Sequence, residues 1–392
     1  MRNPPAPKTD ELNKGHAQTD PRSAAEGSGG PHPHPHTHRG PIASLFVAIA
    51  TLAVAAFGGA VFFWLHAPLP WTLGALTAAG IAAAVTGQHL LQPQLRIVVR
   101  PIVGVLAGSA FTAEILASMV QWWSAILLIV LYSLAMLFVG YFYFRKIGRF
   151  DQTTAFFASA PGGLGELSLI GGSLGANMRR LVVVHAIRIL IVVFTVPFAL
   201  QILLGVPIGR TVPTSAPEMT LTGLDWAVLA ACALAGFGLS RVVRFPGGPM
   251  VFALLFSVVA HVSGLTKAAP PPWLVATVQV VLGAVVGTRF AGIRWGEASH
   301  AVLLGTIWGI LMLSSAVFIA YVGTWFLDYP FEAMVLAMAP AGMVEMTLIT
   351  LALGFDVAFV VTCQLCRILF VLLTTPALFS MLGIAPAKSS HD

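Results

Sequence analysis

Long apolar stretches, separated by short polar or Gly- and Pro-containing breaks, run through the chain from residue 42 onward. Many of them approach or exceed the ~20 residues that an α-helix needs to cross a bilayer. The apolar–polar alternation over about ten residues that is typical of a transmembrane β-strand is absent from the sequence. The pattern therefore predicts an all-α polytopic membrane protein.

Ten apolar helices and two interrupted segments are expected. In the first half the helices are expected at 42–65, 69–86, 97–118, 122–144 and 181–204, with an interrupted segment at about 153–172. In the second half they are expected at 224–239, 249–262, 274–289, 301–326 and 357–381, with an interrupted segment at about 332–351.

The composition supports this class and limits the partners. Hydrophobic residues make up 57% of the 392 residues and charged residues 9%, and the mean hydropathy is +0.87. The formal net charge of +6 does not imply nucleic-acid binding, because Lys and Arg lie in short loops, where the positive-inside rule explains them. The bilayer is therefore an expected partner, and direct contact with nucleic acid is not expected.

Residues 1–40 are rich in Pro, Gly, Ser and charge, and too poor in apolar residues to offset the entropy of ordering. We expect a disordered tail there, membrane repeats at 41–205 and 222–385, a linker at 206–221 and a short tail at 386–392. The first tail carries a run that could hold a divalent metal loosely, although a flexible polar tail without a ligand is the favoured interpretation. The run consists of His32, His34, His36 and His38.

Three cysteines give no sign of a disulfide framework, because Cys232, Cys363 and Cys366 all lie in apolar, helix-like sequence. The spacing of Cys363 and Cys366 formally matches a redox motif. The corresponding residues of the first half are Val184 and Ile187, so packing is the favoured role.

One stretch occurs twice, as Ala-Pro-Gly-Gly-Leu-Gly-Glu at 160–166 and as Ala-Pro-Ala-Gly-Met-Val-Glu at 339–345. The copies are 179 residues apart (345 − 166), and the same offset relates the two halves without a gap from Pro70 to Pro376. The sequence therefore predicts an internal duplication. In each copy a proline interrupts the helix and glycines permit an unusual backbone and close approach. These residues are Pro161, Gly162, Gly163, Gly165, Pro340 and Gly342.

Two further features recur in both halves. Asn177 and Asp356 come just before a helix and are expected to be N-caps. A Gly-x-x-x-Gly spacing, which lets helices approach closely, is expected to serve packing against the interrupted segment. It occurs at Gly104 and Gly108 and again at Gly283 and Gly287.

The basic loops distinguish two topologies. If the motif crossed the membrane fully, each half would have six spans, and Arg179 and Arg180 would lie outside. If the motif enters and returns, each half has five crossings, the two halves have inverted topology, and most basic residues lie inside. The charge distribution favours the second arrangement. It predicts that both termini lie in the cytoplasm, and the expected location is an inner (plasma) membrane of bacterial type.

Glu166 and Glu345 are candidate binding groups, because a carboxylate at membrane depth is costly and marks a functional site by default. Each could carry a proton or form part of a cation site. The structural alternative is a buried ion pair with Arg188 or Arg367, each of which follows its glutamate by 22 positions (188 − 166 and 367 − 345). A role that combines pairing and function is also open.

His185 and Arg188, at positions i and i+3, share a helix face, as do Gln364 and Arg367. Both faces are expected to look into the site, because an Arg facing lipid is unfavourable by about 2.5–3.5 kcal/mol on insertion scales. The exchange of His for Gln makes the halves inequivalent. His185 could bias proton coupling, or it could be a hydrogen-bonded polar residue.

These two motif copies, each followed by a helix carrying Arg188 or Arg367, resemble the AbrB-type membrane proteins with duplicated domains. The resemblance covers about residues 42–385, and both copies match the pattern Ala-Pro-x-Gly-x-x-Glu. Members of that family are often labelled ammonia monooxygenase or regulator of gene expression. In its repeat plan the chain is also similar to cation/proton antiporters and bile-acid symporters, which is an analogy of fold alone.

Three function classes were weighed. Interrupted segments at equivalent places of inverted halves are typical of a secondary transporter, here of a small polar or anionic solute. A membrane regulator of gene expression is the runner-up, and it would act indirectly because no DNA-binding module is evident. An enzyme is not expected, and neither is a metal or cofactor: a copper or iron oxygenase needs clustered ligands, whereas the histidines outside the tail are scattered.

The candidate solute- or ion-binding residues are Pro161, Gly162, Gly163, Glu166, His185, Arg188, Pro340, Gly342, Glu345, Gln364 and Arg367.

Overall fold

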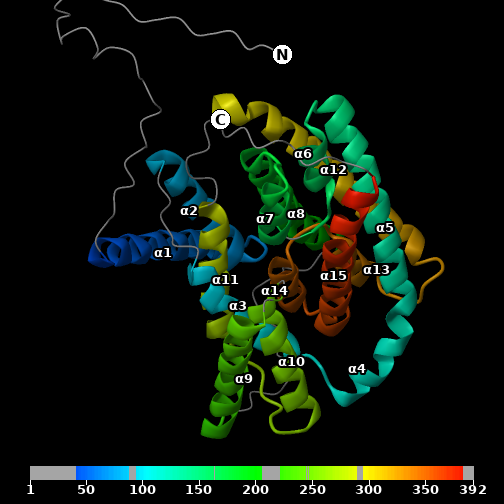
Figure 1. Cartoon of the computed structure of the whole chain (residues 1–392). Helices are drawn as coiled ribbons and strands as arrows, with labels where there is room; N and C mark the ends of the chain where they lie inside the picture. Colours follow the sequence, from blue (N-terminus) through cyan, green and yellow to red (C-terminus); the bar gives the residue numbers. More distant parts are fainter. Residues whose placement is uncertain are drawn as a thin grey trace, which may run out of the picture. The chain divides into compact units, whose positions relative to one another are not determined.

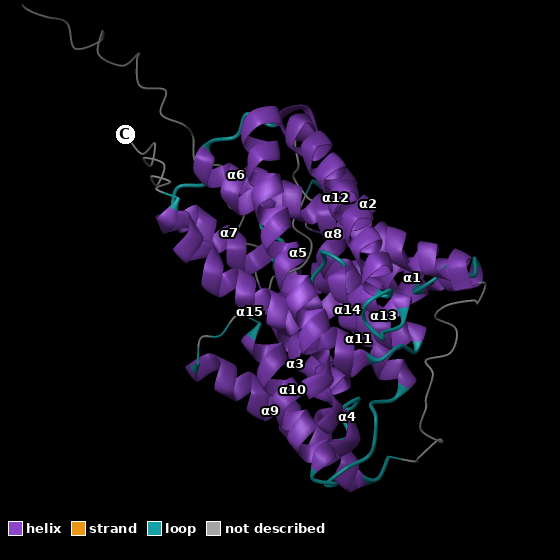
Figure 2. Ribbon diagram, turned by 90° about the vertical axis from the view of Figure 1, so that its right-hand side faces the viewer, coloured by secondary structure: helices purple, strands orange, loops and turns teal. Residues whose placement is uncertain are grey.

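The computed structural model describes residues 41–87, 94–162, 164–204, 221–243, 245, 247–288 and 295–382. Within these ranges all regular structure is helical (Figure 2), which confirms the predicted all-α class. The His run, the linker and the C-terminal tail lie outside the described residues.

The helices of the first half, which Figure 1 labels in chain order, are α1 (Pro41–Trp64), α2 (Pro70–Thr86), α3 (Gln94–Gly108), α4 (Ala113–Ser118), α5 (Trp123–Phe142), α6 (Gln152–Ser159), α7 (Leu164–Ser173) and α8 (Met178–Leu204). A 3₁₀ turn, η1 (Met119–Trp122), leads into α5, and a π turn, η2 (Tyr143–Ile147), follows it. The second half contains α9 (Gly223–Val242), α10 (Gly248–Val262), α11 (Pro272–Gly287), α12 (Trp295–Gly323), α13 (Phe331–Met338), α14 (Met343–Leu353) and α15 (Val357–Met381).

Six candidate spans in the described part of the chain are long and apolar enough to cross a membrane. They are Leu45–Trp64, Ala113–Ile147, Met178–Leu203, Gly223–Val242, Ser299–Gly323 and Val357–Met381. Four further helices that the sequence predicted as crossings, α2, α3, α10 and α11, have only 15 to 17 residues. At 1.5 Å per residue they are about 25 Å long or less, which is shorter than the usual span.

The helix predicted at 97–118 was wrong in one respect, because the structure divides it. Helix α3 ends at Gly108, and α4 begins at Ala113 after an extended Thr112. The Thr112 hydroxyl accepts a hydrogen bond from the Ile115 backbone N–H at 3.3 Å. This N-cap starts a new helix and gives a physical reason for the break.

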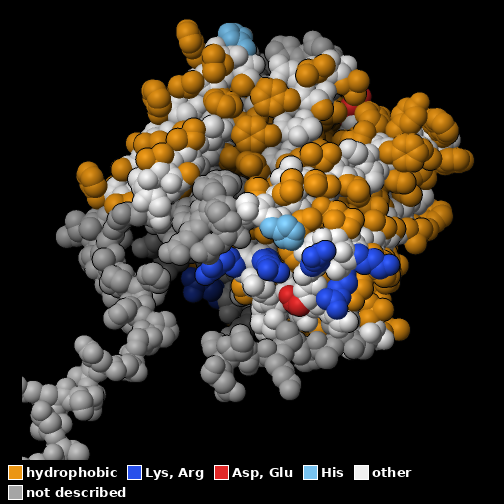
Figure 3. All heavy atoms as spheres, turned by 90° about the horizontal axis from the view of Figure 1, so that it is seen from above, with side chains coloured by type: hydrophobic (Ala, Val, Ile, Leu, Met, Phe, Trp, Pro, Cys, Tyr) orange, Lys and Arg blue, Asp and Glu red, His pale blue; other side chains and the backbone are white. Residues whose placement is uncertain are grey.

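Large apolar side chains are exposed on many helices, as contact with lipid requires. Phe46, Val85, Ile202, Val242 and Met381 are between 73% and 82% exposed. Figure 3 shows a face covered mainly by hydrophobic side chains, with basic side chains gathered toward one edge. Soluble monomers rarely expose such extended apolar surface, so the structure is consistent with a multi-pass membrane protein.

The glycines of the repeated Gly-x-x-x-Gly spacing bring two pairs of helices into backbone contact. A Cβ built on Gly104 would lie 2.2 Å from the Met250 carbonyl oxygen of α10, and one on Gly283 would lie 2.5 Å from the Thr72 carbonyl oxygen of α2. Close helix approach is therefore confirmed. The expected partner was wrong, because the glycines pack against α10 and α2 rather than against the interrupted segments.

The start of α2 and of α10 also corrects the proposed alignment of the two halves. Both helices follow a residue in the left-handed conformation, Leu69 with φ 47° and Gly247 with φ 67°. These equivalent residues are 178 positions apart (247 − 69), so Pro70 corresponds to Gly248 and not to Pro249. The offset of 179 resumes in α3 and α11, and one residue is therefore gained in the connection after α10.

We predict that Gly283→Ala destabilises the protein, because the new Cβ would collide with the Thr72 carbonyl oxygen of α2. Overpacking of this kind costs about 1–3 kcal/mol. The matched control is Gly238→Ala in α9, where a Cβ meets nothing within 4 Å. Melting temperature in detergent, measured by loss of the monodisperse elution peak after heating, should fall for the first variant and not for the second. Equal melting temperatures would contradict the packing described.

Candidate functional site

The first interrupted segment folds as a hairpin. Helix α6 ends at Ser159, residues 160–162 leave the helical path, and α7 begins at Leu164. The Thr154 hydroxyl near the start of α6 accepts a hydrogen bond at 2.8 Å from the backbone N–H of Asn177, which follows α7. The two ends of the segment therefore meet, as expected of a chain that enters and returns.

Basic residues from both sides of this hairpin gather at its open end. The Arg145 guanidinium donates a hydrogen bond to the Phe150 carbonyl at 2.9 Å. The guanidinium carbon of Arg180 lies 5.0 Å from the centre of the Phe150 ring. The charges before and after the segment thus lie at the same end, which contradicts the alternative of a full crossing.

The second interrupted segment folds in the same way. Helix α13 ends at Met338, residues 339–342 interrupt the helix, and α14 begins at Met343. Tyr329, which precedes α13, stacks on Phe359 at the start of α15, with ring centroids 4.9 Å apart. The open end of this hairpin is therefore marked by Tyr329 and Phe359.

The two hairpins open toward opposite ends of α5 and α12. At the first open end the Tyr143 hydroxyl, after α5, donates a hydrogen bond to Leu304 O, near the start of α12, at 3.1 Å. At the second open end the Tyr329 hydroxyl, after α12, donates one to Gln121 O, just before α5, at 2.7 Å. Helices α5 and α12 thus run antiparallel, with one hairpin mouth at each end.

The expected N-caps are confirmed at both hairpin exits. The side chain of Asn177 accepts a hydrogen bond from the Arg180 N–H at 3.1 Å. The side chain of Asp356 accepts one from the Phe359 N–H at 3.0 Å. Both polar residues satisfy the first turn of the following helix.

Arg188 satisfies the backbone at the first break. The final carbonyls of an interrupted helix have no partner within the helix. The two terminal nitrogens of Arg188 donate to Ala160 O at 2.9 Å and to Gly162 O at 2.7 Å. The side chain is 1% exposed. Its positive charge therefore lies at the C-terminal end of α6, where the helix dipole favours a cation.

Arg367 repeats this arrangement at the second break. Its terminal nitrogens donate to Ala339 O at 2.7 Å and to Ala341 O at 3.0 Å, with a longer bond to Met338 O at 3.3 Å. Ala339 and Ala341 are the positions that correspond to Ala160 and Gly162 at the offset of 179. The same pair of arginine–carbonyl hydrogen bonds thus occurs in each half, in addition to the same sequence motif.

The ion-pair alternative does not account for Arg367. Its hydrogen-bond acceptors among the described residues are backbone carbonyls and the Gln364 side chain, and the Glu345 carboxylate is not one of them. For the first half, the structure does not describe the Glu166 side chain or Gly163. The backbone does place Glu166 as the third residue of α7, which is the position of Glu345 in α14.

Glu345 is buried in the first turn of α14, where the positive end of the helix dipole favours a carboxylate. It lies directly over the N-cap residue Gly342, where a Cβ would fall within bonding distance of the carboxylate oxygen Oε2. A glycine is thus required for the carboxylate to lie there. Pro161 and Pro340 are buried within the two breaks, as expected.

The two breaks lie close enough for their guanidinium groups to interact. Arg188 and Arg367 act on each other electrostatically, and the Tyr132 hydroxyl of α5 acts on both. This hydroxyl donates to Met312 O of α12 at 2.6 Å. Tyr132 was not among the residues predicted from the sequence, although a tyrosine hydroxyl within an apolar helix generally needs a buried partner.

Charge at this junction is predominantly positive in the described part of the chain. The buried ionic side chains there are Arg188, Arg367 and Glu345. The described residues contain no group of three or more His, Cys, Asp or Glu that could hold a metal ion. An apolar cavity of about 950 Å³ lies between α8, α12 and α13, and its lining includes Val196, Leu200 and Val335 but none of the candidate residues.

His185 and Gln364 confirm that the halves are inequivalent. Gln364 donates to Leu336 O at 2.9 Å and accepts a hydrogen bond from Arg367. His185 is fully buried, and both its ring nitrogens lack a hydrogen-bond partner among the described residues. The Phe157 carbonyl, which corresponds to that of Leu336, interacts with the ring without meeting hydrogen-bond geometry.

Comparison with known proteins places these features in a family. The family described as transition state regulatory protein AbrB matches residues 71–383, which include both breaks and both buried arginines. The chain belongs to the AbrB family. The resemblance inferred from the two motifs is thereby confirmed.

Two curated relatives align with this chain over nearly their whole length. The "Uncharacterized protein YhjN" of Bacillus subtilis (strain 168) is 23% identical over 355 residues, which cover 84% of this chain and 92% of the relative. The "Putative regulator AbrB" of Escherichia coli (strain K12) is 24% identical over 334 residues, which cover 84% of this chain and 94% of the relative. No solved structure matches the chain.

We predict that Arg367→Lys destabilises the protein by about 2–4 kcal/mol, because a lysine ammonium cannot replace a planar donor that serves several buried carbonyls. The control is Arg241→Lys, where the exposed guanidinium lies 4.8 Å from the Phe237 ring centre. Thermal unfolding in detergent should separate the two variants clearly. Similar melting temperatures would show that the carbonyl contacts of Arg367 do not hold the second break together.

Proposed function

We propose that this AbrB-family protein is a secondary transporter of a small polar or anionic solute. It would consist of two inverted-topology repeats and work by alternating access around the paired broken helices. The observation that carries the proposal is the meeting of two buried, interacting guanidinium groups at two interrupted hairpins that open toward opposite ends.

Physical chemistry supports a solute pathway at this junction. Irregular backbone at membrane depth is tolerated where it is buried in protein or lines a wet cavity. Buried ionic residues in such a place mark substrate or ion pathways. Because the hairpins open at opposite ends, a solute held between the breaks has one route toward each side of the membrane. The two buried guanidinium groups favour an anionic or strongly polar solute.

Glu345, and Glu166 by its equivalent backbone position, are proposed to carry the coupling ion or proton. Each belongs to the first turn of a half-helix at the tip of a hairpin. A carboxylate at that place can exchange charge with a solute bound at the neighbouring guanidinium. The proposed location is the inner (plasma) membrane, with both termini in the cytoplasm.

A membrane-embedded regulator of gene expression is the second candidate, favoured by the printed name of the Escherichia coli relative. Any regulatory effect would be indirect, through a transported signal or a partner. Removal of residues 1–40 separates the two candidates. Transport should survive this deletion, whereas regulation transmitted through the tail should not.

We predict that Glu345→Gln and Glu166→Gln reduce coupled uptake at least ten-fold in proteoliposomes, because an amide cannot carry the exchanged charge. Radiolabelled carboxylates and other small anions would be screened under a proton or sodium gradient. Glu114→Gln, which changes an exposed glutamate of α4, is the control and should leave uptake unchanged. If both motif variants match the parent for every solute transported, the glutamates have no transport role.

We predict opposite accessibility of the two hairpin mouths. In a variant lacking its three native cysteines, Lys146→Cys should react with a membrane-impermeant maleimide only from the cytoplasmic side. Asp328→Cys should react only from the outside. Both positions are exposed, so poor reactivity would not mask the result. Labelling of both from one side would overturn the inverted topology.

A further inference from the structure

The two halves repeat the same backbone arrangement, but they differ in how completely their polar groups are satisfied. A guanidinium has five N–H donors. Arg367 uses four of them, on Met338, Ala339, Ala341 and the Gln364 side chain, so only its Nε–H is left. Among the residues that the structure describes, Arg188 donates two hydrogen bonds, so three of its donors have no described partner, its Nε–H among them.

The residues next to the two arginines also have fewer hydrogen-bond partners in the first half than in the second. The position of Gln364, which holds both Arg367 and a carbonyl, is occupied in the first half by His185, whose two ring nitrogens are unpartnered in the described structure. Thr347 of α14 donates to Met343 O at 2.8 Å. The corresponding Ser168 of α7 (347 − 179) is buried with its hydroxyl unpartnered.

A third difference between the halves concerns the helix that packs on each hairpin from the other half, which is α15 for the first hairpin and α8 for the second. Val371, Thr375 and Phe379 share one face of α15. Val371 packs at Gly162, and the Phe379 ring lies 5.6 Å from that of Phe157. Thr375, which lies between Val371 and Phe379 on the same face of α15, is therefore directed toward the first hairpin, and its buried hydroxyl has no partner among the described residues.

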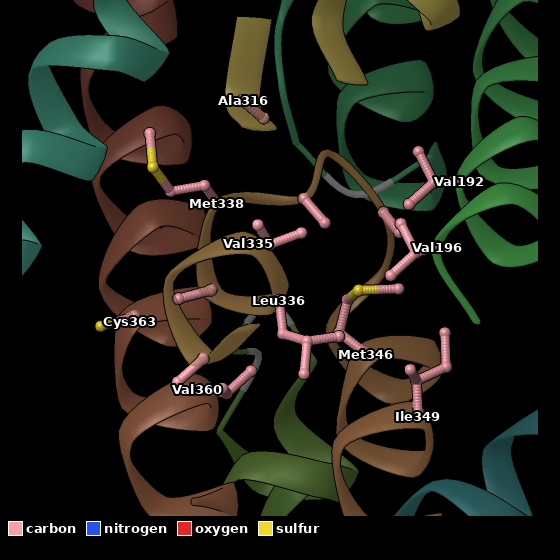
Figure 4. Close-up of a cluster of buried hydrophobic side chains, with 14 of the residues drawn as sticks. Val192, Val196, Ala316, Val335, Leu336, Met338, Met346, Ile349, Val360 and Cys363 are labelled. Atoms are coloured by element: carbon pink, nitrogen blue, oxygen red, sulfur yellow. The ribbon is translucent and has the colours of Figure 1, made fainter. Parts of the chain in front are cut away.

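The matching face of α8 is entirely apolar. The residues that correspond to Val371, Thr375 and Phe379 at the offset of 179 are Val192, Val196 and Leu200. They belong to the apolar core around the second hairpin. Figure 4 shows Val192 and Val196 directed toward the chain between α13 and α14. The second half thus presents apolar side chains where the first presents a hydroxyl, and Val196 and Leu200 also line the apolar cavity between α8, α12 and α13.

A buried donor or acceptor without a partner destabilises the folded protein, so several of them around one cation are not retained by packing alone. A planar guanidinium edge matches the two oxygens of a carboxylate or phosphate. An imidazole and a hydroxyl can each donate to, or accept from, the same group. These donors belong to Arg188, His185 and Thr375, which share the first break.

We propose that the solute-binding site lies in the first half only, where Arg188, His185 and Thr375 bind the acid group of a small oxyanion, while in the second half Gln364 already engages Arg367 and Val196 offers no hydroxyl. The inference rests on the proposed transport function and narrows its substrate class. It states that the protein holds one oxyanion per chain, at the break between α6 and α7.

Exchange of residues between the halves tests this inference. His185→Gln introduces the residue that the second half accommodates, so the variant should fold, and its amide can occupy the spare donors of Arg188. Thr375→Val introduces the equivalent of Val196 and removes the hydroxyl. The reciprocal variant Val196→Thr, which adds a hydroxyl at the equivalent position of the second half, is the matched control.

Binding would be measured on the full chain in detergent as thermal stabilisation by sodium acetate, lactate, phosphate or sulfate, against sodium chloride at equal ionic strength. Bound anion stabilises the folded protein according to its concentration and affinity. We expect at least one of these four anions to stabilise the parent. His185→Gln should weaken its apparent affinity at least ten-fold and Thr375→Val about three-fold or more, whereas Val196→Thr should stay within two-fold of the parent.

Three results would overturn the inference: no stabilisation of the parent by any of the four anions, equal weakening by Val196→Thr, or unchanged affinity in both His185→Gln and Thr375→Val. Transport is measured separately in proteoliposomes. Binding without uptake would refute the transporter proposal and leave this site standing. Uptake that is equally sensitive to changes in both halves would refute the one-sided site and leave the transporter standing.

Discussion

The structure depends on the satisfaction of carbonyl groups where two helices are broken inside an apolar protein. Each break leaves backbone acceptors that cannot reach water. A single arginine from the next long helix meets that requirement in each half, by donating to two carbonyls on either side of the proline. The requirement explains why each hairpin is followed directly by a helix that carries an arginine on its inner face.

This solution also sets the electrostatics of the junction. The buried guanidinium is stabilised by carbonyl oxygens and by the negative end of the preceding half-helix, so the arginine needs no carboxylate to be tolerated. Arg367 shows this directly, since its acceptors are carbonyls and an amide. The Glu345 carboxylate is therefore not the counter-ion of Arg367. A positive charge held by dipoles remains able to attract an anion, because dipoles do not neutralise it.

Much of the fold could be predicted from the sequence, because helix formation in apolar segments is a local property. Proline and glycine marked both breaks, and Asn177 and Asp356 were recognisable N-caps. The division between α3 and α4 was hidden by apolar residues on both sides of Thr112. The shift of one residue in α10 was hidden because two prolines aligned, whereas the structure aligns the left-handed residues Leu69 and Gly247.

The site was less predictable, since its principal acceptors are backbone atoms that every residue possesses. Spacing alone suggested a salt bridge between Glu345 and Arg367, and no pattern of side chains could reveal that Ala339 and Ala341 provide the oxygens instead. Tyr132 lies in a different helix, far from the motifs in sequence, and only the packing of α5 against α12 brings it to both arginines. The function of Gly342 likewise depends on where one carboxylate lies in space.

The duplication has a further consequence for a protein that works at the meeting point of two halves. Two equivalent breaks with equally unsatisfied arginines would create two anion sites within the range of each other's charge, and occupation of one would oppose occupation of the other. Gln364 accepts a hydrogen bond from Arg367, and Val192 and Val196 pack on the second break with apolar side chains, so this competition does not arise. The hydrogen bonds from Arg367 to the backbone carbonyls of the break are kept. The hydrogen bonds from each arginine to the carbonyls of its break thus preserve the fold of both hairpins. The residues that differ between the halves allow one break to bind the anion while the other remains part of the core.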